Sequence, residues 1–112
     1  METRAIARYI RMSPQKVRLV ADTVRGKKVE EALATLQHTT KAAAKVVSKV
    51  VKSAAANVEH NLKAGNPEDF RVAVITVDGG PMLKRHRAVA MGRAAKIWKR
   101  TSHITVVLRD GI

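Results

Sequence analysis

The strongest constraint on this fold comes from two segments, residues 70–78 and 101–109, and from the long stretch between them. Val, Ile and Thr dominate both segments, which predicts two strands that are each buried on one face. Strands close in sequence usually pair antiparallel, but their connections normally have two to five residues. The connection here, residues 79–100, is far longer, so it either has a structure of its own or lacks structure.

The composition of this connection narrows the choice. It has seven Lys or Arg residues, one His and no acid. An unstructured loop, a short helix over residues 88–99 and a two-stranded ribbon turning near 88–92 are all open, and we favour the ribbon. At about 3.3 Å per residue the ribbon projects roughly 25–30 Å from the body. Isolated ribbons are marginally stable in water, so we expect this ribbon to lie against a partner. Its positive charge predicts that the partner presents phosphate.

The first half of the chain predicts one extended segment and three helices. Residues 2–11 read as a strand or arm. Ser13-Pro14 predicts a helix start, with the helix running to about Val24 and stopping at Gly26. A second helix fits residues 29–37, and a third fits 41–63, with Thr39 or Thr40 as its N-cap.

The third helix predicts one apolar and one basic side. At about 100° per residue its valines fall on one side, whereas four lysines gather on the other. These lysines are Lys41, Lys45, Lys49 and Lys52. The helix is therefore expected to pack in the core and to turn a basic stripe outward.

Charge points to a polyanionic partner. The 112 residues, expected to form one domain over 1–112, include 22 Lys or Arg and only 9 Asp or Glu, giving a net charge of +13. Between Asp78 and Asp110 there are eight cations and no acid. Such a surface attracts nucleic acid, and the scattered cations suit a folded RNA recognised by shape and phosphate. Aromatic residues are only 3% of the chain, which disfavours base stacking on aromatic platforms.

No catalytic or metal constellation is visible. There is no cysteine, and the four histidines are not spaced as a helical zinc site. Gly79-Gly80-Pro81 lacks a following Lys-Ser or Lys-Thr helix and is better interpreted as the bend where a strand leaves the body. We therefore expect a protein that is not an enzyme and has no cofactor or metal. No apolar run approaches the length of a membrane span.

Four runs resemble a known family: Ser13-Pro14-Gln15-Lys16-Val17-Arg18-Leu19-Val20, Arg25-Gly26-Lys27-Lys28, Ser53-Ala54-Ala55-Ala56-Asn57 and Lys99-Arg100-Thr101-Ser102-His103-Ile104-Thr105-Val106. They are similar to the bacterial family of large-subunit ribosomal protein number twenty-two, and the similarity runs nearly end to end. The resemblance implies an α+β fold with three helices on a three-stranded antiparallel sheet and a protruding β-hairpin at about 79–100.

The resemblance also implies a function. A member of this family is a structural constituent of the cytoplasmic ribosome that binds large-subunit rRNA, supports early assembly and lines the nascent-peptide exit tunnel with its hairpin. The implied partners are rRNA, neighbouring large-subunit proteins and the nascent peptide near the hairpin tip, with no membrane and no small-molecule substrate.

The expected site residues follow from the charge and the resemblance together. Expected rRNA contacts are Arg4, Arg8, Arg11, Lys16, Arg18, Arg25, Lys27, Lys28, Lys84, Arg85, Arg87, Arg93, Lys96, Lys99, Arg100, Thr101, Ser102 and His103. The expected tip is Ala88, Val89, Ala90, Met91 and Gly92. The family usually has Pro-Arg where this chain has Ala88-Val89.

Three rival functions make different predictions. A general architectural nucleic-acid-binding protein would bind duplex DNA comparably, but the chain shows no apolar groove wedge beside an Arg arm. A membrane-surface protein is suggested by the Met, Leu, Ile and Trp residues among the cations of 82–98, and would prefer vesicles to RNA. An RNA-modifying enzyme would need an acid–base group, and no candidate is present.

Overall fold

The computed structural model of the chain describes residues 2–60, 70–88, 92 and 94–109, and at 59–60, 83, 85–88 and 94–98 it describes the backbone alone. Its elements run in the order β1 (Glu2–Ile10), α1 (Pro14–Val24), α2 (Val29–His38), α3 (Ala42–His60), β2 (Arg71–Gly79), β3 (Leu83–Ala88), β4 (Ala94–Lys99) and β5 (Ser102–Arg109). This is the predicted α+β arrangement of three helices, a sheet and a hairpin.

The sheet has three strands in the order β1-β5-β2, and both pairs are antiparallel. The two β-branched segments therefore pair with one another, as predicted, and the N-terminal arm adds to the free edge of β5. Alternate residues of β5, from Ser102 to Leu108, are buried, while those between them are half-buried. One face of the sheet is thus packed against the core and the other is left open.

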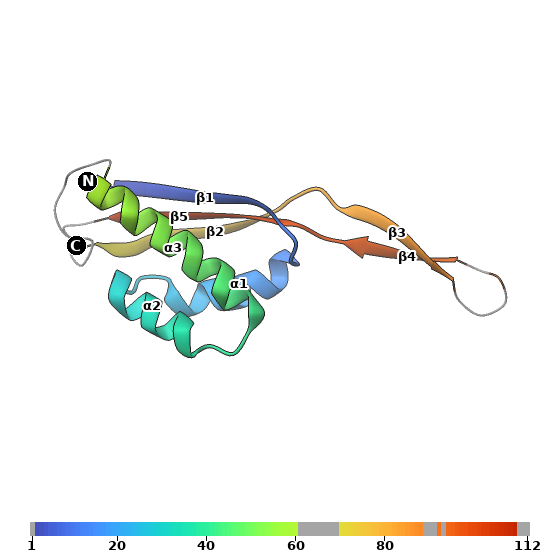
Figure 1. Cartoon of the computed structure of the whole chain (residues 1–112), viewed down its shortest axis with the longest axis horizontal. Coiled ribbons are helices and arrows are strands. Elements are labelled where there is room, and N and C mark those ends of the chain that lie inside the picture. The colour runs from blue at the N-terminus through green and yellow to red at the C-terminus, as the bar shows by residue number, and fades with distance from the viewer. Residues whose placement is uncertain (1, 61–69, 89–91, 93, 110–112) are drawn as a thin grey trace.

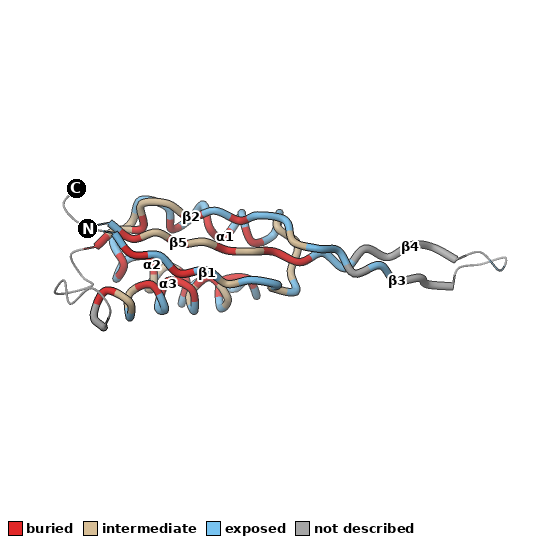
Figure 2. Tube along the Cα trace, turned by 90° about the horizontal axis from the view of Figure 1, so that it is seen from above, coloured by how far each residue is buried: buried red, intermediate tan, exposed pale blue. Residues whose placement is uncertain are grey.

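All three helices lie on the packed face (Figure 1), and Figure 2 looks onto the open one. Helix α3 packs on β1 and β5, and α1 packs on β2. Valines supply most of the interface: Val17, Val20 and Val24 of α1 and Val47, Val51 and Val58 of α3 are all at most 1% exposed. The predicted apolar sides of these helices are confirmed, and the four lysines opposite the α3 valines are exposed.

The long connection forms the predicted ribbon. Strands β3 and β4 pair antiparallel from Leu83 with Lys99 to Ala88 with Ala94, separately from the main sheet. The alternative helix over residues 88–99 is wrong, because 94–99 is a strand. The chain measures 63 × 26 × 18 Å, and its radius of gyration is 17.0 Å, against about 13 Å for a compact chain of this length. The hairpin accounts for this elongation (Figure 1).

Two expected helix caps differ from the structure. Ser13 occupies the N-cap position of α1, but its side chain makes no capping hydrogen bond. Thr39 does not cap α3, which begins at Ala42; it is the C-cap residue of α2, and its hydroxyl donates to the Thr35 carbonyl at 2.7 Å. The threonine instead closes the helix before it, and the residue immediately before α3 is Lys41 rather than a Ser, Thr, Asp or Asn.

Within the described segments, no helix combines the length and apolarity required to cross a bilayer.

Candidate nucleic-acid interface

The hairpin joins the body at a neck, defined here as residues 11–13, 80–82 and 99–102. Hydrogen bonds tie its strands together. The Thr101 hydroxyl donates to the Pro81 carbonyl at 2.7 Å, and the Ser102 hydroxyl donates to the Met12 carbonyl at 2.6 Å. The Gly80 amide donates to the Thr101 carbonyl at 3.0 Å. Strand β2 ends at Gly79 and β3 of the separate ribbon begins at Leu83, so the strand leaves the body at Gly79-Gly80-Pro81 as predicted.

Thr101 and Ser102 were expected to contact rRNA, and the structure places them inside the neck. Thr101 is 5% exposed and Ser102 is fully buried. Because both hydroxyls already donate to backbone carbonyls, their observed role is to fix the hairpin to the body. The predicted RNA contact of these two side chains gains no support from their position.

A bulge in β1 shapes the body beside the neck. The register with β5 shifts between Ala7 and Ile10, and Tyr9 has a φ of 58°. The Tyr9 amide donates to Nδ1 of His103 at 3.1 Å, and the two rings meet edge to face with centroids 5.0 Å apart. His103 thus has a structural contact in this position, and the Tyr9 side chain is exposed.

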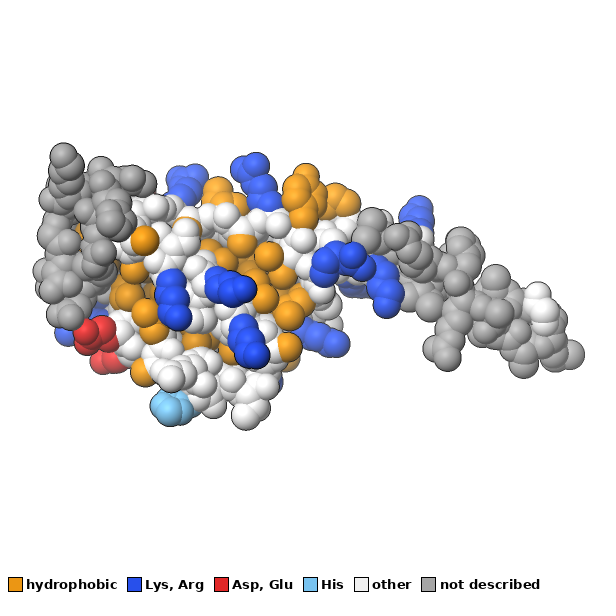
Figure 3. Space-filling model, viewed as in Figure 1, with side chains coloured by type: hydrophobic (Ala, Val, Ile, Leu, Met, Phe, Trp, Pro, Cys, Tyr) orange, Lys and Arg blue, Asp and Glu red, His pale blue; other side chains and the backbone are white. Residues whose placement is uncertain are grey.

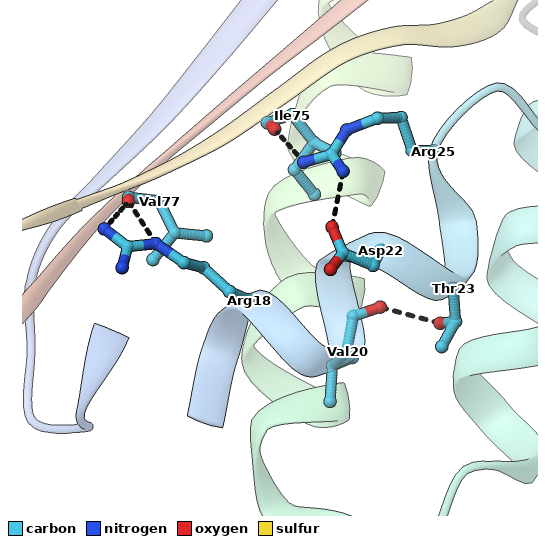
Figure 4. Close-up of polar contacts among 7 residues, drawn as sticks. All are labelled: Arg18, Val20, Asp22, Thr23, Arg25, Ile75 and Val77. Atoms are coloured by element: carbon cyan, nitrogen blue, oxygen red, sulfur yellow. Dashed lines mark hydrogen bonds and ion pairs between the residues drawn. The ribbon is translucent and has the colours of Figure 1, made fainter. Parts of the chain in front are cut away.

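Two of the predicted RNA-contacting arginines bind the protein's own backbone (Figure 4). Arg18 donates to the Val77 carbonyl from both Nε and Nη2, at 3.1 and 2.9 Å. Arg25 donates to the Ile75 carbonyl at 2.8 Å and also pairs with Asp22. Both guanidinium groups hold α1 and its C-cap against the edge strand β2, so their charge is partly committed to the fold.

The remaining predicted cations of the body fall into two groups. Arg4 and Arg8 extend from β1, and Lys28 lies at the N-cap of α2; all three are exposed. Lys27 is half-buried and donates to the Thr35 hydroxyl at 3.2 Å. The first three are open to a partner, whereas Lys27 supports the α1–α2 connection.

Five exposed cations surround a cleft of about 850 Å³ beside the neck: Arg11, Lys16, Lys41, Lys99 and Arg100. They come from three segments far apart in sequence. Figure 3 shows Lys and Arg side chains over the body and also where the hairpin leaves it, while the acidic side chains visible on this face lie at the opposite end. No Asp or Glu lines this cleft.

The end of the body away from the hairpin contains an ion pair between β1 and β5. Arg109 Nε donates to a carboxylate oxygen of Glu2 at 2.7 Å. This hydrogen bond, together with the attraction of the guanidinium charge, lowers the pKa of the Glu2 carboxyl. This ion pair joins β1 to β5 and does not involve any cation of the neck.

The predicted contact residues of the hairpin are described mainly by their backbone. Lys84 is exposed on β3, and Gly92 has a φ of 70°, which suits the turn between the strands. Arg85, Arg87 and Lys96 lie on the two strands, with Ala88 ending β3 rather than lying in the turn; their side chains are outside the described part. Val89, Ala90, Met91 and Arg93 lie outside the described residues.

One body residue of the interface region was not predicted to have a contact. Asn57, on α3, donates from its side-chain amide to the Arg4 carbonyl at 3.0 Å and so joins the helix to β1. A lone polar residue on the otherwise apolar and alanine-rich run 54–58 was the available signal. The described segments hold no group of three or more His, Asp or Glu residues able to bind a metal ion.

Known proteins resemble this chain over almost its full length. The pattern of the family described as ribosomal protein L22p/L17e matches residues 5–109. Large ribosomal subunit protein uL22 of Desulforamulus reducens is 59% identical over 110 residues, covering 98% of this chain and 96% of the relative. The proteins of that name from Pelotomaculum thermopropionicum and Herpetosiphon aurantiacus are 56% and 55% identical, covering 98% and 99% of this chain and 96% and 97% of the relatives. The chain belongs to the ribosomal protein L22p/L17e family, a family of structural proteins rather than enzymes.

Proposed function

We propose that this chain is a structural protein of the large subunit of the cytoplasmic ribosome that binds large-subunit rRNA through phosphate and shape. The observation that carries the proposal is the acid-free connection 79–100, which has seven cations and whose described strands, β3 and β4, pair as a ribbon separate from the main sheet. A free two-stranded ribbon is marginally stable, and these cations repel one another. Surrounding RNA supplies both the packing surface and the opposite charge.

The body contributes a second part of the proposed contact. The cations Arg11, Lys99 and Arg100 of the neck and Lys16 beside it are exposed, and neither hydrogen bonds nor ion pairs engage their side chains within the described part of the chain. Arg4, Arg8 and Lys28 extend the proposed surface, and Arg18, Arg25 and Lys27 belong to it only through the parts of their side chains that the fold leaves free.

The hairpin tip has a separate proposed role. In this proposal, residues 88–92 line the nascent-peptide exit tunnel. The chain binds during early assembly of the subunit, beside neighbouring ribosomal proteins. The relatives are named as large ribosomal subunit proteins, which supports a place in that subunit, and the described strands β3 and β4 extend away from the body, which supports a contact at a distance from it (Figure 1). A photoreactive residue introduced at position 90 should crosslink to nascent peptides in translating ribosomes, and a ribosome in which it crosslinks only to rRNA would contradict a tunnel-facing tip.

The test of rRNA binding compares large-subunit rRNA fragments with an unrelated RNA duplex at two salt concentrations. Binding to the cognate fragments should be tighter and should weaken steeply with salt, because bound cations release counterions. Equal binding to both RNAs would leave only a general nucleic-acid-binding protein. Recovery of the full chain in the large-subunit fraction of a sucrose gradient gives an independent check.

A matched pair of variants locates the contact. Lys99→Gln with Arg100→Gln removes two charges from the neck, while Lys49→Gln with Lys52→Gln removes two from the outer side of α3. The neck pair should weaken binding more and should reduce the salt slope by about 1.5–2, the value for two lost phosphate contacts. An equal effect of both pairs would mean that net charge alone determines affinity.

A further inference from the structure

The cleft beside the neck has the size of a ligand site rather than of a packing defect. Its volume of about 850 Å³ lies in the roughly 300–1,000 Å³ range of small-molecule sites. Its walls come from residues 11–19 at the start of α1, 41–43 at the start of α3, and 99–100 at the base of the hairpin. Three parts of the fold thus meet around one hollow.

The charge around the cleft is of one sign. The five cations named above line it, and no Asp or Glu does. No hydrogen bond or ion pair within the described residues engages the side chain of any of the five. Five like charges around one hollow repel one another, so the arrangement favours an anion that enters it.

The starts of α1 and α3 strengthen this preference. Acids in a first turn stabilise a helix, and α2 has Glu30 and Glu31 there. Neither α1 nor α3 has an acid in its first turn; they have Lys16 and Lys45 instead. Ser13, which lines the cleft, leaves its hydroxyl free of the helix it precedes. Cations in the first turn and an unused capping hydroxyl both lower the stability of the free chain. The same features favour a phosphate bound at these helix starts.

The remainder of the lining is apolar, and a phosphate alone does not explain it. Met12, Leu19, Ala42 and Ala43 form this part, and Leu19 is 56% exposed, a large apolar side chain open to water. Unstacked bases bind to apolar side chains and to the flat guanidinium groups of arginine, and Arg11 and Arg100 offer two such planes. A paired duplex presents phosphates but keeps its base faces stacked.

We propose that this cleft binds one unstacked nucleotide of RNA, with its phosphate among the cations and its base against the apolar lining. The inference rests on the proposed binding of rRNA and names what part of the RNA the neck takes. It predicts that the chain recognises a bulge or loop, and not only the shape of a helix.

Three RNA hairpins of one sequence test the proposal with the full chain. The first has a single bulged nucleotide, the second has an abasic nucleotide at the bulge, and the third is fully paired. Removing roughly 60 Å² of apolar surface from water changes affinity about tenfold, so the bulged hairpin should bind about tenfold more tightly than the other two. The abasic hairpin keeps the bend and the phosphates, so it isolates the base.

Variants of two exposed alanines on α3 connect the preference to the cleft. Ala42→Leu fills the hollow and keeps every charge, whereas Ala56→Leu makes the same change elsewhere on the helix. Ala42→Leu should remove the preference for the bulge with little change in binding to the paired hairpin, and Ala56→Leu should keep the preference. Leu19→Gln, on α1, is a second cleft variant that does not touch the start of α3. It should also weaken the preference for the bulge, which keeps the test valid if Ala42→Leu disturbs that helix start.

The outcomes separate this inference from the function on which it rests. Equal binding of the bulged and abasic hairpins, or a preference that survives both cleft variants, overturns the nucleotide site while rRNA binding stands. Failure of the chain to prefer large-subunit rRNA overturns both. Ultraviolet crosslinking of the bound bulge should attach the nucleotide to the peptide containing residues 11–19, and attachment solely to the hairpin strands would also overturn the site.

Discussion

Adding a single methyl group at Gly80 should disturb the junction between hairpin and body. A Cβ at this position would lie 2.4 Å from Oγ1 of Thr101 and 3.1 Å from Nε2 of His103. Thr101 is buried, and its hydroxyl donates to the Pro81 carbonyl, so the nearest obstacle is not a free side-chain end. Gly80→Ala therefore forces either the threonine to rotate or the two strands of the neck to separate.

Both responses have a similar free-energy cost. Rotation of Thr101 breaks its hydrogen bond inside the neck, which costs about 1–3 kcal/mol when the hydroxyl stays buried. Separation of the strands is overpacking, which also costs about 1–3 kcal/mol. We expect Gly80→Ala to lower the free energy of unfolding by about 2 kcal/mol and, for a chain of this length, to lower Tm by roughly 8 °C.

Gly79→Ala is the matched control, because a Cβ at Gly79 would meet only Pro14, at 4.0 Å. Urea unfolding of both variants, followed by far-ultraviolet circular dichroism, measures the difference. Adding Thr101→Ala should at least halve the cost of Gly80→Ala, since the clashing oxygen is removed. Equal stability of the two glycine variants would refute the reasoning that close packing at Gly80 fixes the hairpin.

Three further changes have defined outcomes. Arg18→Lys should destabilise the chain by about 1 kcal/mol in urea unfolding, because one ammonium cannot replace the two-pronged bond to a β2 carbonyl, and an unchanged midpoint would contradict that role. Ser102→Ala should cost about 1–2 kcal/mol, since the Met12 carbonyl loses its buried donor; thermal melts check this, and a neutral effect would assign the hydroxyl no structural role. The hydrogen bond from Arg109 lowers the pKa of Glu2 below 4.5, so the stability it gives is present above the unfolded pKa and is lost as pH falls through the folded value. The Tm difference between the wild type and Glu2→Gln should accordingly be seen at pH 7 and disappear well below pH 4.5, and a difference that persists in acid would exclude the ion pair as its cause.

Periodicity and turn chemistry were sufficient to predict most of the elements. Helix α1 begins at Pro14 and ends at Val24, as the Ser13-Pro14 start and the Gly26 stop predict, and Gly26 has the left-handed φ of 83° expected after a helix. The hairpin followed from a different argument, because two strands that must pair leave their long, acid-free connection few options. The helix prediction depends on local rules and the hairpin prediction on strand pairing, and tertiary contacts overrode neither.

The use of individual polar side chains was beyond sequence reasoning. Arg18 reaches a carbonyl 59 residues away in sequence, and Ser102 reaches one 90 residues away, so only the folded chain reveals their partners. The left-handed Tyr9 was also unpredictable, since a bulge in β1 depends on its register with β5. Thr39 shows the same limit at short range. It lies between α2 and α3 and could cap the end of the first or the start of the second, and the sequence does not say which helix it caps.

The split among the basic residues explains why net charge alone is a poor guide to the RNA contact. Arginines beside strand carbonyls, such as Arg18, serve the fold because a guanidinium can donate two bonds to a backbone oxygen while keeping its charge. Lys16 and Lys41 have no such partner in the described part and lie at helix starts, where a cation lowers stability by about 0.3–1 kcal/mol. Replacing them with acids would stabilise the free chain and remove the positive charge that attracts phosphate. At these positions stability and RNA binding therefore require opposite charges, and the chain has the charge that suits RNA.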